Sequence, residues 1–280
     1  MPLVATGELV KHAEATGGAV GSYNAICLEH AEAIATGAEE AGLPAIVQIS
    51  ENAVRFHGGR LGPIAAACAA VARGSTADLA LHLDHVESPA LLREAEQHAI
   101  GSVMVDASKL PYEANVERTR DAVAWAHARQ LWVEAELGEV GGKDGAHAPG
   151  ARTDPHQAER FVEATGVDAL AVAVGSSHAM TSRTAVLDLD LIGRLRAAVP
   201  VPLVLHGSSG VPDASLREAV AAGIVKVNIG TALNVAFTAA VRQRLAVEAS
   251  LVDPRRYLHP ARDAIAAVVT TSLRTLSPAT

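Results

Sequence analysis

The chain has 280 residues, of which 49% are hydrophobic, 19% charged and 3% aromatic, and its formal net charge is −8. This composition predicts a folded globular protein, and the negative charge argues against nucleic acid or an anionic membrane surface as a partner. Cys27 and Cys68 give no disulfide framework, the N-terminus lacks an apolar signal segment, and no apolar run approaches the ~20 residues that span a bilayer. We therefore expect a cytoplasmic protein without a membrane partner.

Short apolar segments alternate along the whole chain with segments of helical periodicity, such as "EHAEAIATGAEEAG" and "PYEANVERTRDAVAWAHARQ". The apolar segments predict strands at 18–24, 44–50, 79–85, 101–107, 131–137, 168–175, 201–207 and 224–230. Most of the intervening helices are expected to end at Gly or just before Pro, as at Gly42 and Gly223. Roughly eight βα units over residues 1–280 predict one α/β domain, a (β/α)₈ TIM barrel. The alternative is an open doubly wound sheet, but "GGAVGSYN" lacks the G-x-G-x-x-G turn typical of that fold.

Every predicted strand ends in a polar or metal-binding residue. These residues are Asn24, Ser50, Asp84 with His85, Asp106, Glu134 with Glu136, His178, His206, and Asn228 with Thr231. In such barrels the carboxyl ends of the strands and the loops that follow them form the active site. The sequence therefore predicts that these side chains surround one active-site mouth.

Three of the twelve histidines, His85, His178 and His206, lie at or just past the ends of the third, sixth and seventh strands. Three neutral imidazoles with an open fourth position are typical of a catalytic divalent metal, above all Zn²⁺. Surface or capping roles are expected for His12, His30, His98, His127, His156 and His259, and a hydrogen bond inside the barrel for His82.

Carboxylates accompany the predicted metal ligands. Asp84 precedes His85 and, by strand alternation, points to the opposite side of the strand, which suits a proton-transfer group held beside the metal. Asp106 and Glu136 add carboxylates at the rim, either as functional groups or as internal polar packing. The Gly- and Pro-rich segment 138–155 predicts a mobile lid that carries Asp144 as a second acid/base, or else a disordered polar loop.

Two small-residue segments follow the seventh and eighth strands, where barrels often bind phosphate. They are "LHGSSG" (205–210), with Gly207, Ser208 and Ser209, and "NIGT" (228–231), from Asn228 through Ile229 and Gly230 to Thr231. Small residues let backbone N–H groups approach an anion closely, and hydroxyl groups add donors. The sequence therefore predicts a phosphate site that needs none of the four lysines.

With these residues assembled, the chain resembles a class II, metal-dependent ketose-bisphosphate aldolase over nearly its full length. The resemblance rests on "HLDH", "SVMVDAS", "VEAELGEVGG", "VDALAVAVGSSHAM", "PLVLHGSSG", "VKVNIGT" and "DPRRYLHPARDAI", in that order. It implies that His85, His178 and His206 bind the catalytic zinc and that Asp84 handles the proton on the C4 oxygen of the substrate. It also implies a second or alternative metal position at Asp106 and Glu136.

The resemblance further implies contacts to the substrate and between subunits. The segments Gly207–Ser209 and Asn228–Thr231 would hold the dihydroxyacetone phosphate end, and Asn24 and Ser50 would lie near the substrate carbonyl and phosphate. Arg255 would reach the far phosphate, in some members from a neighbouring subunit. The family expectation is a homodimer or homotetramer, with a monovalent cation, Na⁺ or K⁺, near the phosphate in some members.

Four positions depart from the family pattern. Ala179 stands where, in the family, a Gly commonly follows the second zinc histidine and contributes backbone to the phosphate and cation site, and an Ala there is strained if φ is positive. Thr181 replaces a frequent aromatic, Asp144 stands in the lid where a glutamate is usual, and Gly230 replaces a side chain that touches sugar hydroxyls in fructose-specific members. These departures leave the sugar epimer open.

The expected reaction is reversible cleavage of fructose or tagatose 1,6-bisphosphate to dihydroxyacetone phosphate and glyceraldehyde 3-phosphate. Three alternatives remain open from the residues. One is a related class II aldolase that acts on another phosphorylated keto-sugar or sugar acid. Another is Schiff-base chemistry on Lys226, which faces the same way as Asn228, although pairing with interior carboxylates also explains this lysine. The third is a catalytically silent barrel that binds sugar phosphates.

Overall fold

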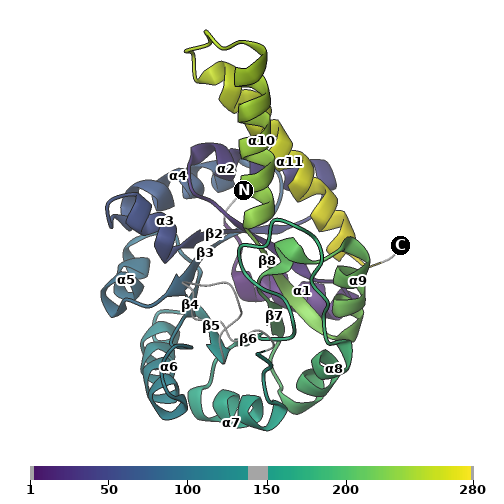
Figure 1. Ribbon diagram of the computed structural model, residues 1–280. Helices are drawn as coiled ribbons and strands as arrows, with labels where there is room; N and C mark the ends of the chain where they lie inside the picture. Colours follow the sequence, from purple (N-terminus) through teal and green to yellow (C-terminus); the bar gives the residue numbers. More distant parts are fainter. Residues whose placement is uncertain (1–2, 138–150, 279–280) are drawn as a thin grey trace.

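The structure, a computed structural model, describes residues 3–137 and 151–278. Eight parallel strands close into a barrel in which each strand pairs with the next along the chain and β8 pairs with β1 (Figure 1). The strands are β1 (Val20–Asn24), β2 (Ala45–Ser50), β3 (Leu79–Val86), β4 (Ser102–Val105), β5 (Trp132–Leu137), β6 (Ala169–Val172), β7 (Leu203–Leu205) and β8 (Ile224–Ile229). The predicted single-domain (β/α)₈ barrel is confirmed, and each predicted strand overlaps one of these.

Helices surround the barrel (Figure 1). They are α1 (Thr6–Thr16), α2 (Leu28–Ala41), α3 (Glu51–Phe56), α4 (Leu61–Gly74), α5 (Pro89–Glu94), α6 (Tyr112–His127), α7 (Pro155–Thr165), α8 (Leu189–Ala198), α9 (Asp213–Ala222), α10 (Thr231–Val247) and α11 (Arg255–Leu276), with short 3₁₀ turns at Ala95–Gln97 and Ser208–Gly210. Glycine ends several of them as predicted: Gly17, Gly42 and Gly166 have φ of 73°, 66° and 69°. This left-handed conformation caps the last carbonyl groups at little steric cost because glycine has no Cβ.

Helix α1 covers the end of the barrel at which the strands begin. Its residues Leu9, Val10 and Ala13 pack in one cluster with residues near the starts of β1, β2, β3 and β8. This packing leaves the opposite end, where the carboxyl ends of the strands meet, as the open end of the barrel.

The interior of the barrel carries polar side chains that pair with one another. Ser22 donates to Gln48, and the hydroxyl of Ser102 lies 2.8 Å from Nδ1 of His82, which confirms the predicted hydrogen bond inside the barrel. All four side chains are buried. Each of them needs a partner because water does not reach it.

One histidine departs from the expectation of a surface or capping role. His30 is buried in α2, with Nδ1 3.1 Å from Sγ of Cys27 and its ring stacked on Phe237. Its ring covers apolar surface between α2 and α10, a contact between distant segments that spacing along α2 does not reveal.

Helices α10 and α11 pack on each other and extend beyond the barrel, so the turn that joins them lies away from it (Figure 1). Helix α10 buries Leu233 alone among its residues, all of which the structure describes. In the described part of the chain, no helix is both long and apolar enough to cross a membrane.

Helices α2 and α11 approach most closely at Gly37, where a Cβ atom would lie 2.6 Å from Cβ of Val269 and 2.7 Å from the carbonyl oxygen of Ala266. We expect Gly37→Ala to lower the free energy of unfolding by about 1–3 kcal/mol, the usual cost of overpacking. Urea denaturation followed by circular dichroism measures this change.

The matched control is Gly193→Ala in α8, because no atom lies within 4 Å of a Cβ built at Gly193. This variant should raise the free energy of unfolding by about 0.5–1 kcal/mol through helix propensity alone. Equal shifts of both variants in the same direction would contradict the assignment of a tight contact at Gly37.

Candidate active site

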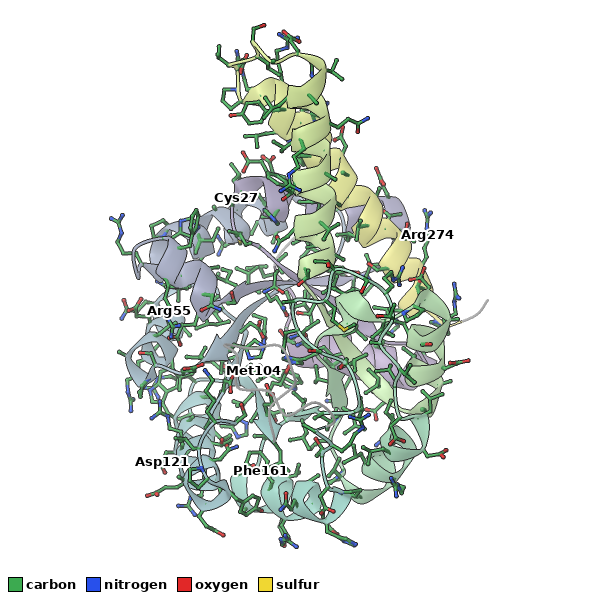
Figure 2. All side chains as sticks on the ribbon, in the orientation of Figure 1. Cys27, Arg55, Met104, Asp121, Phe161 and Arg274 are labelled. Carbon is green, nitrogen blue, oxygen red and sulfur yellow. The ribbon has the colours of Figure 1, made fainter. Side chains whose placement is uncertain are left out.

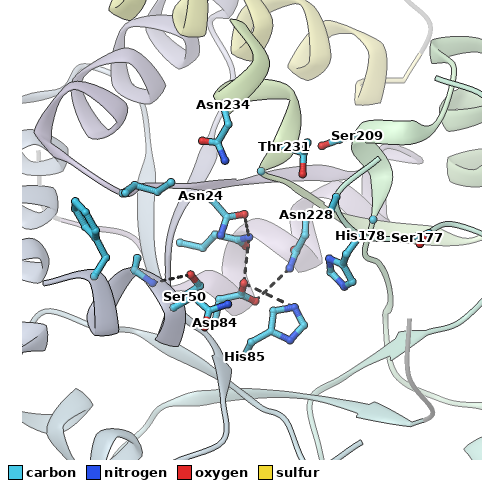
Figure 3. Close-up of a pocket in the computed structure, with 18 residues that line it drawn as sticks. Asn24, Ser50, Asp84, His85, Ser177, His178, Ser209, Asn228, Thr231 and Asn234 are labelled. Atoms are coloured by element: carbon cyan, nitrogen blue, oxygen red, sulfur yellow. Dashed lines mark hydrogen bonds and ion pairs between the residues drawn. The ribbon is translucent and has the colours of Figure 1, made fainter. Parts of the chain in front are cut away.

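A cavity of about 480 Å³ opens at the carboxyl ends of the strands. Eleven of the predicted site residues line it: Asn24, Ser50, Asp84, His85, His178, Ala179, Gly207, Ser209, Asn228, Gly230 and Thr231. Figure 3 shows Asp84, His85, His178 and Asn228 around one space, with Ser209 and Thr231 on one side and Ser50 on the other. The strand ends thus meet at one mouth, as the sequence indicates.

The remaining predicted residues have other positions. His206, Asp106 and Glu136 are buried directly beside His85. Ser208 and Ile229 are buried and turned away from the cavity, since the Ser208 hydroxyl donates to the carbonyl of Asn228 and Ile229 belongs to the apolar core. Asp144 lies outside the described residues.

Arg255 does not reach the cavity of its own chain. It begins α11, beyond the barrel, and its guanidinium donates to the carboxylate of Asp253 (Figure 1). Its side chain is 88% exposed. A contact with the far phosphate therefore requires a second copy of the chain, and it stays a prediction.

His85, His178 and His206 converge on one point. One ring nitrogen of each lies within 4.8 Å of those of the other two, and the ring planes meet at 71° to 88°. Nε2 of His85 and Nδ1 of His206 are 3.1 Å apart. Two nitrogens that bind a tetrahedral zinc ion at ~2.0–2.1 Å lie about 3.3 Å from each other. The three rings therefore fit a zinc ion.

Carboxylates fix the orientation of two of these rings. Nδ1 of His85 is 2.8 Å from Oδ2 of Asp106, and Nε2 of His206 is 2.8 Å from Oε1 of Glu134. An ionised carboxylate only accepts hydrogen bonds, so these nitrogens carry the protons and the other nitrogen of each ring keeps its lone pair. This is the usual outer contact of a metal-binding histidine. The free lone pairs are those of the two atoms that lie 3.1 Å apart.

Burial keeps His206 in the form that a metal requires. The ring is fully buried, and this burial lowers the pKa of His206 although Glu134 acts in the opposite direction. Since only a neutral imidazole binds a metal, the lowered pKa suits the ligand role. The site thus meets three requirements for binding zinc: three imidazole donors, suitable tautomers of His85 and His206, and a His206 ring held in the neutral form.

A second group of possible ligands shares His85. Its Nδ1 lies 2.8 Å from Asp106 and 3.9 Å from Oε2 of Glu136, and the ligand atoms of these three residues lie within 4.8 Å of one another. An ion there would take the place of the proton that Asp106 accepts. The second position predicted at Asp106 and Glu136 is therefore an alternative use of the same imidazole.

The end of β3 corrects one prediction. Asp84 and His85 were expected on opposite sides of the strand, yet both line the cavity, with Oδ2 of Asp84 4.0 Å from Nε2 of His85. His85 has φ of 51°, and the pairing of β3 with β4 shifts register between Leu83 and Val86. Such a bulge ends the alternation of side chains and turns two successive residues to the same side.

Asp84 is held between donors. It is 2% exposed, and its carboxylate accepts from Nε2 of Gln48 at 3.4 Å and from Nδ2 of Asn228 at 3.3 Å. Burial acts to raise the pKa of Asp84, but the nearby His85 and His206 outweigh it and hold that pKa below its usual value. Asp84 is thus an ionised base at the mouth of the barrel.

Gln48 is a site residue that the sequence reasoning missed. Its Oε1 accepts from Ser22, so its Nε2 faces Oδ1 of Asn24 at 2.8 Å and Asp84 at 3.4 Å. The available signal was a polar residue inside the apolar segment "AIVQIS", two positions before Ser50 and therefore on the same face of β2. Gln48 thereby fixes the carboxylate and the carboxamide together.

Asn24 occupies the space that a side chain at position 230 would need. A Cβ atom on Gly230 would lie 2.6 Å from Oδ1 of Asn24. The departure from the family pattern at Gly230 is therefore coupled to Asn24. In this chain, Asn24 presents the polar group on that side of the cavity.

The opposite side of the cavity suits an anion. Helix α10 begins at Thr231, and the Ser209 hydroxyl accepts from the N–H of Ala232 at 3.1 Å. Gly207 has φ of 65°, and a Cβ atom there would lie 2.6 Å from the carbonyl carbon of Ser177, so only glycine fits. A 17-residue helix whose first N–H groups and positive dipole end lie beside small residues is typical of a phosphate site.

Lys226 is not available as a nucleophile. Its ammonium group is fully buried, 2.8 Å from Oε2 of Glu134 and 2.6 Å from Oδ1 of Asn228. The reading of Lys226 as a charge paired with interior carboxylates is confirmed. Its ion pair argues against Schiff-base chemistry.

Comparison with known proteins identifies a family whose members are aldolases. The sequence model of the family described as fructose-bisphosphate aldolase class-II matches residues 4–279. The structure is similar to the YdjI aldolase from Escherichia coli K12, with a TM-score of 0.85 and 30% identity over 98% of this chain and 97% of that one. A protein from Coccidioides immitis, provisionally assigned as a fructose-1,6-biphosphate aldolase, gives a TM-score of 0.86 and 28% identity over 96% and 94% of the two chains.

A third structure, fructose-bisphosphate aldolase from Campylobacter jejuni, gives a TM-score of 0.83 and covers 98% of this chain and 95% of that one. At 20% identity it supports the fold alone.

The backbone conformation of Ala179 is expected to lower the stability of the protein. Its φ is 59°, the left-handed conformation that strains residues with a Cβ. We expect Ala179→Gly to raise the free energy of unfolding by about 0.5–1 kcal/mol through relief of this strain. Thermal and urea unfolding measure the change. The control Ala128→Gly, at φ of −61°, should lower the free energy of unfolding by a similar amount. A loss of stability in both variants would contradict the strain.

Proposed function

The chain belongs to the class-II fructose-bisphosphate aldolase family and is therefore a lyase, and from this premise we propose that it cleaves a ketose 1,6-bisphosphate reversibly. The products would be dihydroxyacetone phosphate and glyceraldehyde 3-phosphate, and the substrate would be fructose or tagatose 1,6-bisphosphate. The observation that carries the proposal is the placement of three converging imidazoles, the Asp84 carboxylate and an anion site around one cavity.

The three imidazoles would hold Zn²⁺, which when bound supplies Lewis-acid polarisation of the substrate carbonyl. Asp106 and Glu134 keep the rings of His85 and His206 in the required tautomers. The group formed by His85, Asp106 and Glu136 is proposed as an alternative position for a second divalent ion, because an ion there would replace the proton on Nδ1 of His85.

Asp84 would take the proton of the C4 hydroxyl group. The C3–C4 bond then breaks, its electron pair moves toward the C2 carbonyl, and the aldehyde half leaves with C4 as its carbonyl carbon. Nδ2 of Asn228, which faces Asp84, is a donor for the oxygen on which charge develops. Asp144 would return a proton at C3, an assignment that rests on its place in the sequence alone.

The phosphate of the dihydroxyacetone half would bind at Gly207, Ser209 and the first turn of α10. Anchoring there fixes the ketose along the cavity so that its reacting carbons lie beside Asp84 and the three imidazoles. A monovalent cation beside this phosphate, a cytoplasmic location and assembly as a homodimer or homotetramer complete the proposal.

Another phosphorylated keto-sugar or sugar acid is the second candidate, because Gly230, with Asn24 in the space of its missing side chain, departs from the pattern of fructose-specific members. A silent sugar-phosphate-binding barrel is less well supported, since such a protein has no need of the buried base and of the three oriented rings. Turnover of fructose and tagatose 1,6-bisphosphates, measured by coupled reduction of dihydroxyacetone phosphate, separates the candidates.

Removal of the metal should abolish activity. We expect prolonged dialysis against a chelator to reduce kcat below about a hundredth, and one equivalent of Zn²⁺ to restore it, because positioned metal polarisation supplies several kcal/mol. The variant His178→Ala should lose the bound zinc, whereas His12→Ala on the exposed face of α1 should retain it. Full activity in zinc-free protein would overturn the metal role, and borohydride trapping with substrate would point back to Lys226.

Asp84→Asn should lower kcat by about 10²–10⁴-fold, the range for loss of a positioned acid/base. The side chain keeps its shape, so zinc content measured by atomic absorption should not change. The control is Asp121→Asn on the exposed side of α6, labelled in Figure 2, which should keep the wild-type kcat. A kcat within threefold of wild type for Asp84→Asn would remove this residue from the reaction.

A further inference from the structure

We propose that Lys226 is a positioning residue that fixes the side-chain amide of Asn228 for the reaction. The proposal rests on the proposed function of the same cavity. It assigns a task to a buried lysine that binds neither substrate nor metal.

Lys226 lies in the middle of β8, at the centre of the barrel. Its side chain is 0% exposed, and its ammonium group has two acceptors, Oε2 of Glu134 at 2.8 Å and Oδ1 of Asn228 at 2.6 Å. An ammonium group offers only donors. Each group that it touches must therefore present an oxygen.

This condition decides which way the Asn228 amide faces. Its oxygen is turned toward Lys226, so its NH₂ group is turned toward the cavity, with Nδ2 3.3 Å from Oδ1 of Asp84. The reverse orientation would place NH₂ against the ammonium group and the amide oxygen against the Asp84 carboxylate. Both contacts would be repulsive, so one buried charge selects a single orientation.

The other contact of Lys226 leads to the metal site. Oε2 of Glu134 accepts from the ammonium group of Lys226 at 2.8 Å. Oε1 of the same carboxylate lies 2.8 Å from Nε2 of His206, which donates to it. Asn228 Nδ2 is 3.1 Å from the same nitrogen, and since both atoms carry hydrogen this contact is not a hydrogen bond.

Stability alone is a weak reason for this arrangement. Replacing a buried ion pair by apolar residues of similar volume is often neutral or stabilising. Lys226 and Glu134 are both fully buried, and each contacts a group at the cavity. The arrangement is therefore better explained by the orientation that it imposes than by the energy that it adds.

The first test is Lys226→Met, which keeps the length of the side chain and removes the donors. We expect kcat to fall about 10²-fold, the scale of a lost donor to developing charge, with KM within threefold of wild type. Lys11→Met, an exposed lysine of α1, is the control and should retain the wild-type kcat.

A double-mutant cycle with Asn228→Ala separates positioning from a general structural effect. If Lys226 acts through Asn228, Lys226→Met should change kcat less than threefold when Asn228 is already Ala. Additive losses in the double variant, or a kcat of Lys226→Met within threefold of wild type, would overturn the proposal.

Lys226→Met leaves the buried Glu134 carboxylate without its ion-pair partner, and such an unpaired buried charge can prevent folding. The cycle is therefore repeated with Glu134→Gln present in all four variants, so that Lys226→Met leaves no lone charge, and Lys226→Met should again change kcat less than threefold when Asn228 is Ala. A wild-type protein inactive on every ketose phosphate would overturn the proposed function instead. The amide orientation is then read from a crystal structure of Lys226→Met, where an unchanged distance of 3.3 Å between Asn228 Nδ2 and Asp84 would overturn the positioning role.

Discussion

His206 and Asn228 take their orientation from two buried charged side chains, Glu134 and Lys226, and Glu134 lies at the centre of that arrangement. One carboxylate oxygen accepts from His206 and the other from Lys226. Because water does not reach these atoms, each donor and acceptor has a single satisfactory arrangement. These contacts fix the direction in which His206 offers its lone pair and the direction in which Asn228 presents its NH₂ group. Two buried side chains inside the barrel, Glu134 and Lys226, thus orient groups of the site although neither lines the cavity.

The second constraint is backbone geometry at the cavity rim. Among the described residues, His85, Gln130 and Ala179 are the non-glycine positions with positive φ, and His85 and Ala179 line the cavity. Such conformations cost about 1–3 kcal/mol each and persist where surrounding structure enforces them. At His85 the conformation brings the proposed metal ligand His85 and the proposed base Asp84 to the same side of β3. Backbone strain is thus located where it places functional groups.

The sequence allowed the fold and the convergence of the three histidines to be predicted, because both depend on local pattern. Apolar strands, amphipathic helices and glycine at helix ends define the barrel, and polar residues at the strand ends mark the site. The sequence did not reveal the bulge after Leu83, because nothing in the segment around Asp84 and His85 departs from the pattern of a regular strand. Gln48 and the contacts of Glu134 with His206 and of Lys226 with Asn228 were also missed, because they depend on which interior residues face one another.

Charge explains how a chain of net charge −8 accommodates an anionic sugar. Among the described residues that line the cavity there is neither Lys nor Arg, so the proposed phosphate site near Ser209 relies on N–H groups and the dipole of α10. Backbone donors have fixed directions, which makes them selective for one position of an anion. The side of the cavity near Ser50 has no such helix end of comparable length, because α3 spans six residues. A second phosphate proposed there would need a cation from elsewhere, and the exposed Arg255 would supply one only if two copies of the chain met.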